Sequence, residues 1–359
     1  MKENKKKINI LFPYNSVGGA FRSTYEICNR LTKKGYDIVI YFPLIPLMEN
    51  NKIISVEGLI FFIRSLVRNI LRSSSVNWFN LDCKSKQILY IGDKFIRDAD
   101  IIIANHWPTA FPVYNLSSSK GKKFYFIRDI EQWSDFYHLE KKCFQLPMSR
   151  LVTTEFISNF LADNLELDCT AIIRNGFNFE DFKVSEKKFS VADCTISMIY
   201  SDHPMKGIRD GIKCLQSIKK KFPSCTILLF GFSKKPKLDF DFKFIRKPVK
   251  EELREVYAST DIFLCPSLQE GWHNPPSEAM AAKCSVVATN VGSVPYTIED
   301  SVNGYVVEPG DFQKMDEYIS NLIQNRDLRI SISETAHNKI QNLTWDDPVE
   351  KLNEIFTRV

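Results

Sequence analysis

The 359-residue sequence lacks several features that mark common functional classes. Its nine cysteines include no CxxC pair, so the pattern excludes an ordinary zinc site and predicts reduced, mostly buried thiols without a disulfide framework. No uncharged apolar run is long enough to cross a membrane, and the run after the basic N-terminus is too short for a signal peptide. We therefore expect a cytoplasmic protein, and peripheral contact with the inner face of the cytoplasmic membrane stays open.

A concentrated basic stripe is also missing. The net charge is only +5, which argues against a nucleic-acid partner. Hydrophobic residues make up 44% and charged residues 25% of the chain, a balance typical of globular proteins. The length is too great for one ordinary core and predicts two domains.

Short apolar runs alternate with helical patterns along the whole chain. The first three are "INILFPY" (8–14), a glycine turn with an amphipathic helix (18–35), and "YDIVIYF" (36–42). A strand, a helix and a second strand in this order predict a βαβ unit with parallel pairing. The other predicted strands are residues 100–105, 123–129, 150–154, 194–201, 225–231, 242–245, 261–267, 285–291 and 304–309.

This alternation predicts two doubly wound α/β domains in tandem. We place the N-terminal domain at residues 1–175, the C-terminal domain at 176–340, and a final helix at 341–359 that packs back towards the N-terminal domain. Ligands bind at the carboxyl ends of the strands in such folds, so we expect the site in a cleft that both sheets face.

The stretch "SLQEGWHNPPSEAMAAKC" (267–284) places two carboxylates at such a strand end. Glu270 falls on the loop after a predicted strand, and Glu278 falls early in the next helix, with Asn274 as its N-cap and two prolines in its first turn. Free N–H groups of that turn offer an anion site. Two carboxylates beside an anion site suit a ligand that carries both phosphates and hydroxyls, such as a nucleotide sugar. The alternative, which we would favour for two glutamates in isolation, is that Glu270 is solvated and Glu278 only interacts with the dipole of its own helix.

The segment 270–311 closely resembles the E-x7-E signature of the retaining glycosyltransferase family 4, which has the GT-B fold of two Rossmann-like domains. The resemblance extends over almost the whole chain and is weakest in the middle of the N-terminal domain. It departs from the family pattern at Ser293 and Tyr296. The family implies that Glu278 accepts hydrogen bonds from the nucleotide ribose and that Glu270 lies near the donor sugar.

Two further segments resemble the donor side of this family. "NSVGGAF" resembles its first glycine loop, and "HPMKG" (203–207) resembles its P-x-KG segment, in which Lys206 would face the diphosphate. The usual Arg before that lysine is Ser201 here, so Arg246 or Lys247 supplies the second charge, or donor affinity is reduced. We expect catalytic roles for Lys206 and Glu270 and donor contacts from Gly19, Ser201, Lys206, His273, Asn274 and Glu278.

His273 stands where the family usually has glycine. It either hydrogen-bonds the donor sugar or fills space against Trp272. On the acceptor side, "ANHWPTAF" (104–111) and "FYFIRDIEQW" (124–133) fall at strand ends, and Arg128 takes the position of a family histidine. The acceptor-side candidates are His106, Arg128, Asp129, Glu131 and Trp133.

Two DxD strings, at 98–100 and 239–241, do not follow apolar strands as a metal site would require, so we predict no metal and no cofactor besides the donor.

Residues 59–79 form a basic amphipathic pattern with Arg64, Arg68 and Arg72. An outer helix of the N-terminal sheet is the favoured interpretation, and docking on an anionic membrane is the alternative.

The resemblance implies a retaining, metal-independent glycosyltransferase that moves a sugar from a nucleoside diphosphate to a glycan or lipid-linked glycan in surface polysaccharide biosynthesis. Two alternatives stay open. The missing arginine at Ser201 motivates a non-catalytic GT-B subunit that binds a glycan or a partner enzyme. The second alternative is a nucleotide-sugar epimerase, which would convert the donor without an acceptor.

Overall fold

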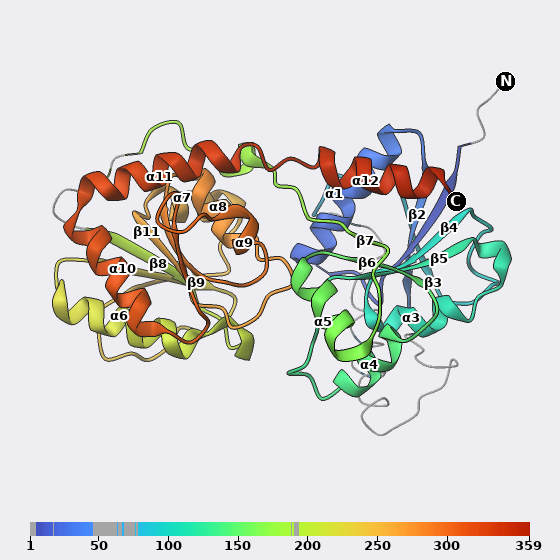
Figure 1. Cartoon of the computed structure of the whole chain (residues 1–359), viewed down its shortest axis with the longest axis horizontal. Coiled ribbons are helices and arrows are strands. Elements are labelled where there is room, and N and C mark those ends of the chain that lie inside the picture. The colour runs from blue at the N-terminus through green and yellow to red at the C-terminus, as the bar shows by residue number, and fades with distance from the viewer. Residues whose placement is uncertain are drawn as a thin grey trace. The chain divides into compact units, whose positions relative to one another are not determined.

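The computed structural model describes residues 5–16, 18–45, 63, 67, 76, 78–187, 189 and 194–359. The chain divides into two compact units (Figure 1). The first, called unit 1, contains residues 1–176 and 345–359, and unit 2 contains residues 177–344. Most of the pattern at 59–79, including its three arginines, lies outside the described residues, so both interpretations of it stay predictions.

Unit 1 is built on a parallel sheet with the strand order β3-β2-β1-β4-β5-β6-β7. Its strands are β1 (Lys7–Leu11), β2 (Asp37–Pro43), β3 (Lys84–Ile88), β4 (Ile101–Ala104), β5 (Lys122–Ile127), β6 (Ser149–Val152) and β7 (Ala171–Ile172). Its helices are α1 (Gly19–Lys33), α3 (Trp107–Tyr114), the 3₁₀ turn η2 (Ser118–Lys120), α4 (Tyr137–Phe144), α5 (Glu155–Leu165) and α12 (Asp346–Thr357).

Both faces of this sheet are buried, because alternate strand residues enter two different cores. Ile8 and Ile10 pack with α1 and α12, whereas Leu11 packs on the other face with α3 and α4. The last helix, α12, lies against α1 (Figure 1), and Phe356 on it is fully buried. The chain's final helix therefore completes unit 1, as predicted.

Unit 2 repeats the architecture with the strand order β10-β9-β8-β11-β12-β13, again parallel. Its strands are β8 (Thr195–Ile199), β9 (Thr226–Gly231), β10 (Lys243–Arg246), β11 (Ile262–Cys265), β12 (Ser285–Thr289) and β13 (Tyr305–Val307). Its helices are η3 (Phe179–Asp181), η4 (Pro204–Lys206), α6 (Ile208–Lys221), α7 (Lys250–Ala258), α8 (Pro275–Ala281), α9 (Val294–Thr297), α10 (Phe312–Gln324) and α11 (Arg326–Ile340).

Each strand order reverses direction once. In unit 1 the reversal falls between β1 and β4, and in unit 2 it falls between β8 and β11. Loops leave opposite faces of the sheet at such a point and open a crevice at the carboxyl ends of the strands. The fold of two Rossmann-like units is therefore confirmed, and it places one topological binding position in each.

Two strands were not predicted from the sequence. β3 (Lys84–Ile88) is mostly polar because it is the edge strand beside β2 and is largely exposed. β7 at the other edge is only two residues long. Both escape a search for apolar runs, because an edge strand needs a partner on one side only.

Candidate active site

A cation and a carboxylate meet at the strand reversal of unit 2. Lys206 follows β8 and Glu270 follows β11, and Lys206 Nζ lies 2.6 Å from Glu270 Oε1. The Ser267 hydroxyl donates to the same oxygen at 2.7 Å. Lys206 and Glu270, 64 residues apart in sequence, therefore form one group at the predicted ligand edge.

The backbone fixes these two side chains relative to each other. Leu268 N–H donates to Met205 O at 2.7 Å, which joins the loop after β11 to the turn that carries Lys206. Gly207, the next residue, has φ of 60°, and a Cβ there would lie 1.7 Å from Pro266 O. Only glycine allows this close approach of the two loops.

Glu270 is ionised in this environment. Burial raises the pKa of its carboxyl, but the His273 ring, the Lys206 ammonium and the Ser267 hydroxyl outweigh burial and hold that pKa below its ordinary value. Burial lowers the pKa of His273 to about 4, so the imidazole is neutral at neutral pH. The charge that faces Glu270 is therefore Lys206.

His273 has an unusual backbone for a residue with a side chain, because its φ is 78°. Its Nε2 lies 3.6 Å from Glu270 Oε1, and its buried Nδ1 has no hydrogen-bond partner among the described residues. The residue borders a cavity of about 20 Å³ that Lys206 and Ser267 also line. A glycine-like conformation explains why the related family has glycine here, and in this chain the ring lies beside Glu270.

Glu278 lies on α8, and its Oε2 accepts a hydrogen bond of 2.8 Å from the buried Tyr257 hydroxyl. Asn274 stands at the N-cap position of this helix, as predicted, but its side chain makes no capping hydrogen bond with the described residues. α8 is only seven residues long and begins with two prolines, which have no N–H to offer. The start of α8 therefore offers an anion fewer N–H groups than the sequence indicated.

The other donor-side residues predicted in unit 2 lie at the carboxyl ends of its strands, whereas Gly19 lies in unit 1. Ser201 follows β8, and its hydroxyl accepts from the His203 N–H at 3.2 Å. Arg246 ends β10, and Lys247 follows it with φ of 53°. β10 is separated from β8 by β9, so neither cation is on the strand next to Lys206.

A second polar group gathers at the strand reversal of unit 1. Gly19 begins α1 after β1, Asn105 follows β4, and Arg128 follows β5. Arg128 Nε donates to Asn105 Oδ1 at 3.0 Å, and its Nη1 lies 3.3 Å from the Ser23 hydroxyl on α1. The start of α1, Asn105 and Arg128 thus lie together, and we call this part of unit 1 the Arg128 corner.

The remaining acceptor-side candidates flank this corner. His106 Nε2 lies 3.2 Å from Glu131 Oε1, and the Trp107 indole N–H donates to Glu131 Oε2 at 3.3 Å. Asp129 accepts the N–H of Ile130 at 2.9 Å. Trp133 is 40% exposed, the most solvent-accessible residue of this set.

Sequence analysis missed three residues of the two groups: Asn105, Tyr257 and Ser267. Asn105 directly follows β4 and Ser267 lies two residues after the end of β11, so polarity just after a buried strand was a usable signal. Tyr257 gave none, because it lies on α7 and reaches Glu278 only through the folded chain.

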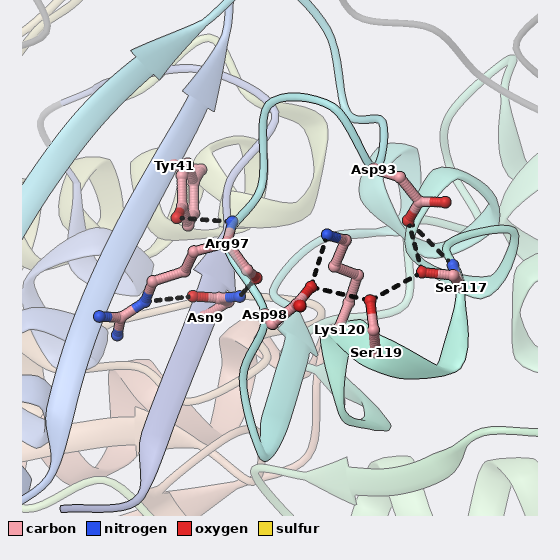
Figure 2. Close-up of polar contacts among 8 residues, drawn as sticks. All are labelled: Asn9, Tyr41, Asp93, Arg97, Asp98, Ser117, Ser119 and Lys120. Carbon is pink, nitrogen blue, oxygen red and sulfur yellow. Dashed lines mark hydrogen bonds and ion pairs between the residues drawn. The ribbon is translucent and has the colours of Figure 1, made fainter.

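The first DxD string lies just before β4, at the amino ends of the unit 1 strands. Figure 2 shows the contacts of its first residue, Asp98. Asp98 Oδ1 accepts from Lys120 Nζ and the Ser119 hydroxyl, each at 2.8 Å. Asp100 Oδ2 accepts the N–H of Lys7, where β1 begins. These contacts hold the amino ends of the strands together, away from the carboxyl ends where the polar groups gather.

Residues 194–325 match the family Glycosyl transferases group 1. The capsular polysaccharide biosynthesis glycosyltransferase CapM of Staphylococcus aureus is 27% identical over 205 residues, which cover 51% of this chain and 54% of CapM. Sucrose-phosphate synthase from Thermosynechococcus elongatus has a TM-score of 0.70 at 15% identity over 99% of both chains. Anabaena Alr3699/HepE, solved with UDP-glucose, has a TM-score of 0.70 at 15% identity over 99% of this chain and 100% of its own.

The two-unit architecture is thus the GT-B fold of these solved structures. Within it, the residues that match the family model, 194–325, all lie in unit 2. The region that matches CapM thus spans only about half of that protein's length. Among the described residues, no helix is long and apolar enough to span a bilayer.

Proposed function

We propose that this chain is a retaining glycosyltransferase. It moves a sugar from a nucleoside diphosphate to a hydroxyl of a glycan or lipid-linked glycan in surface polysaccharide synthesis, and it needs no metal. The observation that supports the proposal best is the contact of 2.6 Å between Lys206 and Glu270, at the strand reversal of the unit that matches the family.

Lys206 is the residue that binds the departing diphosphate. Glu270 Oε1 lies 2.6 Å from its ammonium and holds it near the position that the phosphates take. A cation already positioned there stabilises the charge that develops as the sugar–phosphate bond breaks, and such preorganised charge is usually the largest catalytic contribution. The Glu270 carboxylate is then free to accept hydrogen bonds from the donor sugar.

Glu278 binds the ribose hydroxyls. Its Oε2 accepts a hydrogen bond from the Tyr257 hydroxyl, and this bond fixes the orientation of the carboxylate. The UDP-glucose complex of HepE and the polysaccharide role in the name of CapM support a nucleotide-sugar donor and a glycan acceptor for this chain. No residue is assigned as a general base.

A thermal-shift screen of nucleoside diphosphates tests the donor site. We expect one of them to stabilise the wild type, and Lys206→Ala and Glu278→Ala each to lose that stabilisation. Lys213→Ala is the control, because Lys213 on α6 pairs with Asp210 on the same helix at 3.7 Å and lies 5.1 Å from the centre of the Phe312 ring, with no contact to Lys206 or Glu278 in the described residues. Stabilisation retained in both site variants would refute the donor-site assignment.

Product analysis separates the three candidate activities. A transferase gives a new glycosidic bond whose anomeric configuration, read by NMR, equals that of the donor, and the reaction continues in EDTA. An epimerase changes the donor sugar without an acceptor. Nucleotide binding without turnover in the presence of acceptors would instead support the non-catalytic subunit.

A further inference from the structure

Arg128 has an environment that is incomplete for a cation. Its guanidinium carbon lies 4.0 Å from the centre of the Phe126 ring, and its other contacts are Asn105, Ser23 and Asn175 Oδ1, the last at 3.4 Å. All of these partners are neutral, and no carboxylate of the described residues pairs with it. Burial lowers the pKa of Arg128 to about 9, so it still carries its charge at neutral pH.

Two hydrogen-bond donors in this corner have no acceptor among the described residues. They are Arg128 Nη2 and Asn105 Nδ2, and both atoms are shielded from solvent. The Asn105 amide is only 2% exposed. Its orientation is fixed, because Arg128 Nε must face the carbonyl oxygen, which leaves the NH₂ group as the unsatisfied end.

The surrounding fold favours an anion here. α1 has 15 residues and begins at Gly19 with no acidic residue in its first turn, so its positive end is not neutralised from within. Strand pairing brings the three chain segments together, since Leu11 of β1 lies opposite Ala104 of β4, and Ala104 lies opposite Tyr125 of β5.

The nearby acids do not complete the site. Glu131 faces His106 and Trp107, and the carboxyl of Glu140 accepts the N–H of Glu131 at 2.8 Å. Burial first, and then repulsion from Glu131 and Asp129, raises the pKa of Glu140 to about 9, so Glu140 is protonated at neutral pH. Among the described residues, Glu131 and Glu140 therefore have other partners, and neither pairs with Arg128.

We propose that Arg128 and Asn105 bind an acidic group of a substrate sugar, such as the carboxylate of a uronic acid. This inference rests on the proposed glycosyl transfer and narrows its substrate to a sugar that carries an acid. A guanidinium and a carboxylate form strong, charge-assisted hydrogen bonds, and the acid accepts from both unused donors. The acid is on either the transferred sugar or the acceptor, and both share this chemistry.

Binding measurements by calorimetry with two matched pairs of probes test the proposal. UDP-glucuronate against UDP-glucose places the acid on the transferred sugar, and methyl glucuronide against methyl glucoside places it on the acceptor. We expect the wild type to bind the acidic member of one pair at least tenfold more tightly. Arg128→Gln should abolish that preference, so that the acidic and the neutral member of the pair bind with equal affinity.

Asn105→Asp is the second variant, since it places a carboxylate against Arg128 inside the protein. It should raise the melting temperature and remove acid binding, whereas a purely structural arginine would leave probe binding unchanged. Arg150→Gln is the matched control, because Arg150 is a partly buried arginine of the same sheet that donates to the carbonyls of Phe144 and Leu146.

Two results would overturn the proposal. One is equal affinity for acidic and neutral probes in the folded wild type, in both pairs. The other is an equal loss of affinity for UDP and UDP-glucuronate in Arg128→Gln, which would assign Arg128 to the diphosphate. The methyl glycosides need no nucleotide, so failure of the donor site in the Lys206 test and failure of the acid site are separate outcomes.

Discussion

In unit 2 the cation of the candidate site faces a carboxylate, whereas in unit 1 the cation faces only neutral oxygens. Lys206 is paired with Glu270 before any ligand arrives, and Arg128 has an unused donor beside that of Asn105. A buried donor without a partner costs about 1–3 kcal/mol. In unit 2 the cation thus already has a carboxylate partner, whereas in unit 1 two donors of the described residues remain for a ligand to satisfy.

The difference has consequences for binding. A ligand that binds Lys206 must replace Glu270 as the partner of the ammonium. Its binding free energy is therefore the difference between the contact that forms and the contact that is lost. A ligand at Arg128 displaces no carboxylate of the described residues and satisfies two donors. The contrast is open to direct tests, because each site depends on a few residues within its own unit.

The largest expected effect comes from Gly207→Ala, which breaks the geometry of the unit 2 site. A Cβ would collide with Pro266 O, and φ of 60° is unfavourable for alanine. We expect a loss of about 3 kcal/mol or more in the free energy of unfolding and weaker nucleotide binding. Urea denaturation followed by fluorescence measures the first effect, and calorimetry measures the second.

Gly310→Ala is the control for this prediction. Gly310 also has a positive φ, 89°, but its Cβ would meet nothing within 4 Å. It should lose only about 1–2 kcal/mol, the cost of the backbone conformation. Equal losses in the two variants would show that the approach of the two loops is not what Gly207 provides.

The pH dependence of stability should have opposite signs in the two units. The unfolded chain protonates His273 near pH 6.5, but the folded protein does so only near pH 4, so stability in unit 2 is lost as the pH falls through this window. Glu140 in unit 1 keeps its proton up to about pH 9 when folded, so stability there is lost as the pH rises from its ordinary pKa of 4.5 towards 9.

Each slope amounts to roughly 1.4 kcal/mol per pH unit within its window. Hydrogen exchange of peptides from β5 and β11 reports the two units separately. His273→Gly should reduce the acid sensitivity of unit 2, to which the lowered pKa of Glu270 also contributes, and Glu140→Gln should remove the alkaline sensitivity of unit 1. Identical slopes in the two wild-type units would contradict the charge states assigned here.

The sequence predicted most of the fold, because apolar runs and helical periodicity mark buried parallel strands and the helices that cover them. It missed β3 because the strand is polar at an edge. The pairing of Glu270 with Lys206 could not be predicted, since it depends on which strands become neighbours. The unused donors of Arg128 and Asn105 were equally out of reach, because they follow from side-chain orientations in a folded corner.

The smallest expected effect concerns the amino edge of the unit 1 sheet (Figure 2). Asp98→Asn removes the ion pair with Lys120, but Asp98 is solvent-exposed, so the attraction is weakened by water and salt. The variant should keep the acid preference and the nucleotide affinity of the wild type and lose only slight thermal stability. A metal-binding DxD motif would behave differently: Asp98→Asn would abolish transfer, and EDTA would do the same to the wild type. Binding and turnover are therefore measured on the variant, and on the wild type with and without EDTA. The results decide whether Asp98 holds the amino ends of the strands together or takes part in the chemistry.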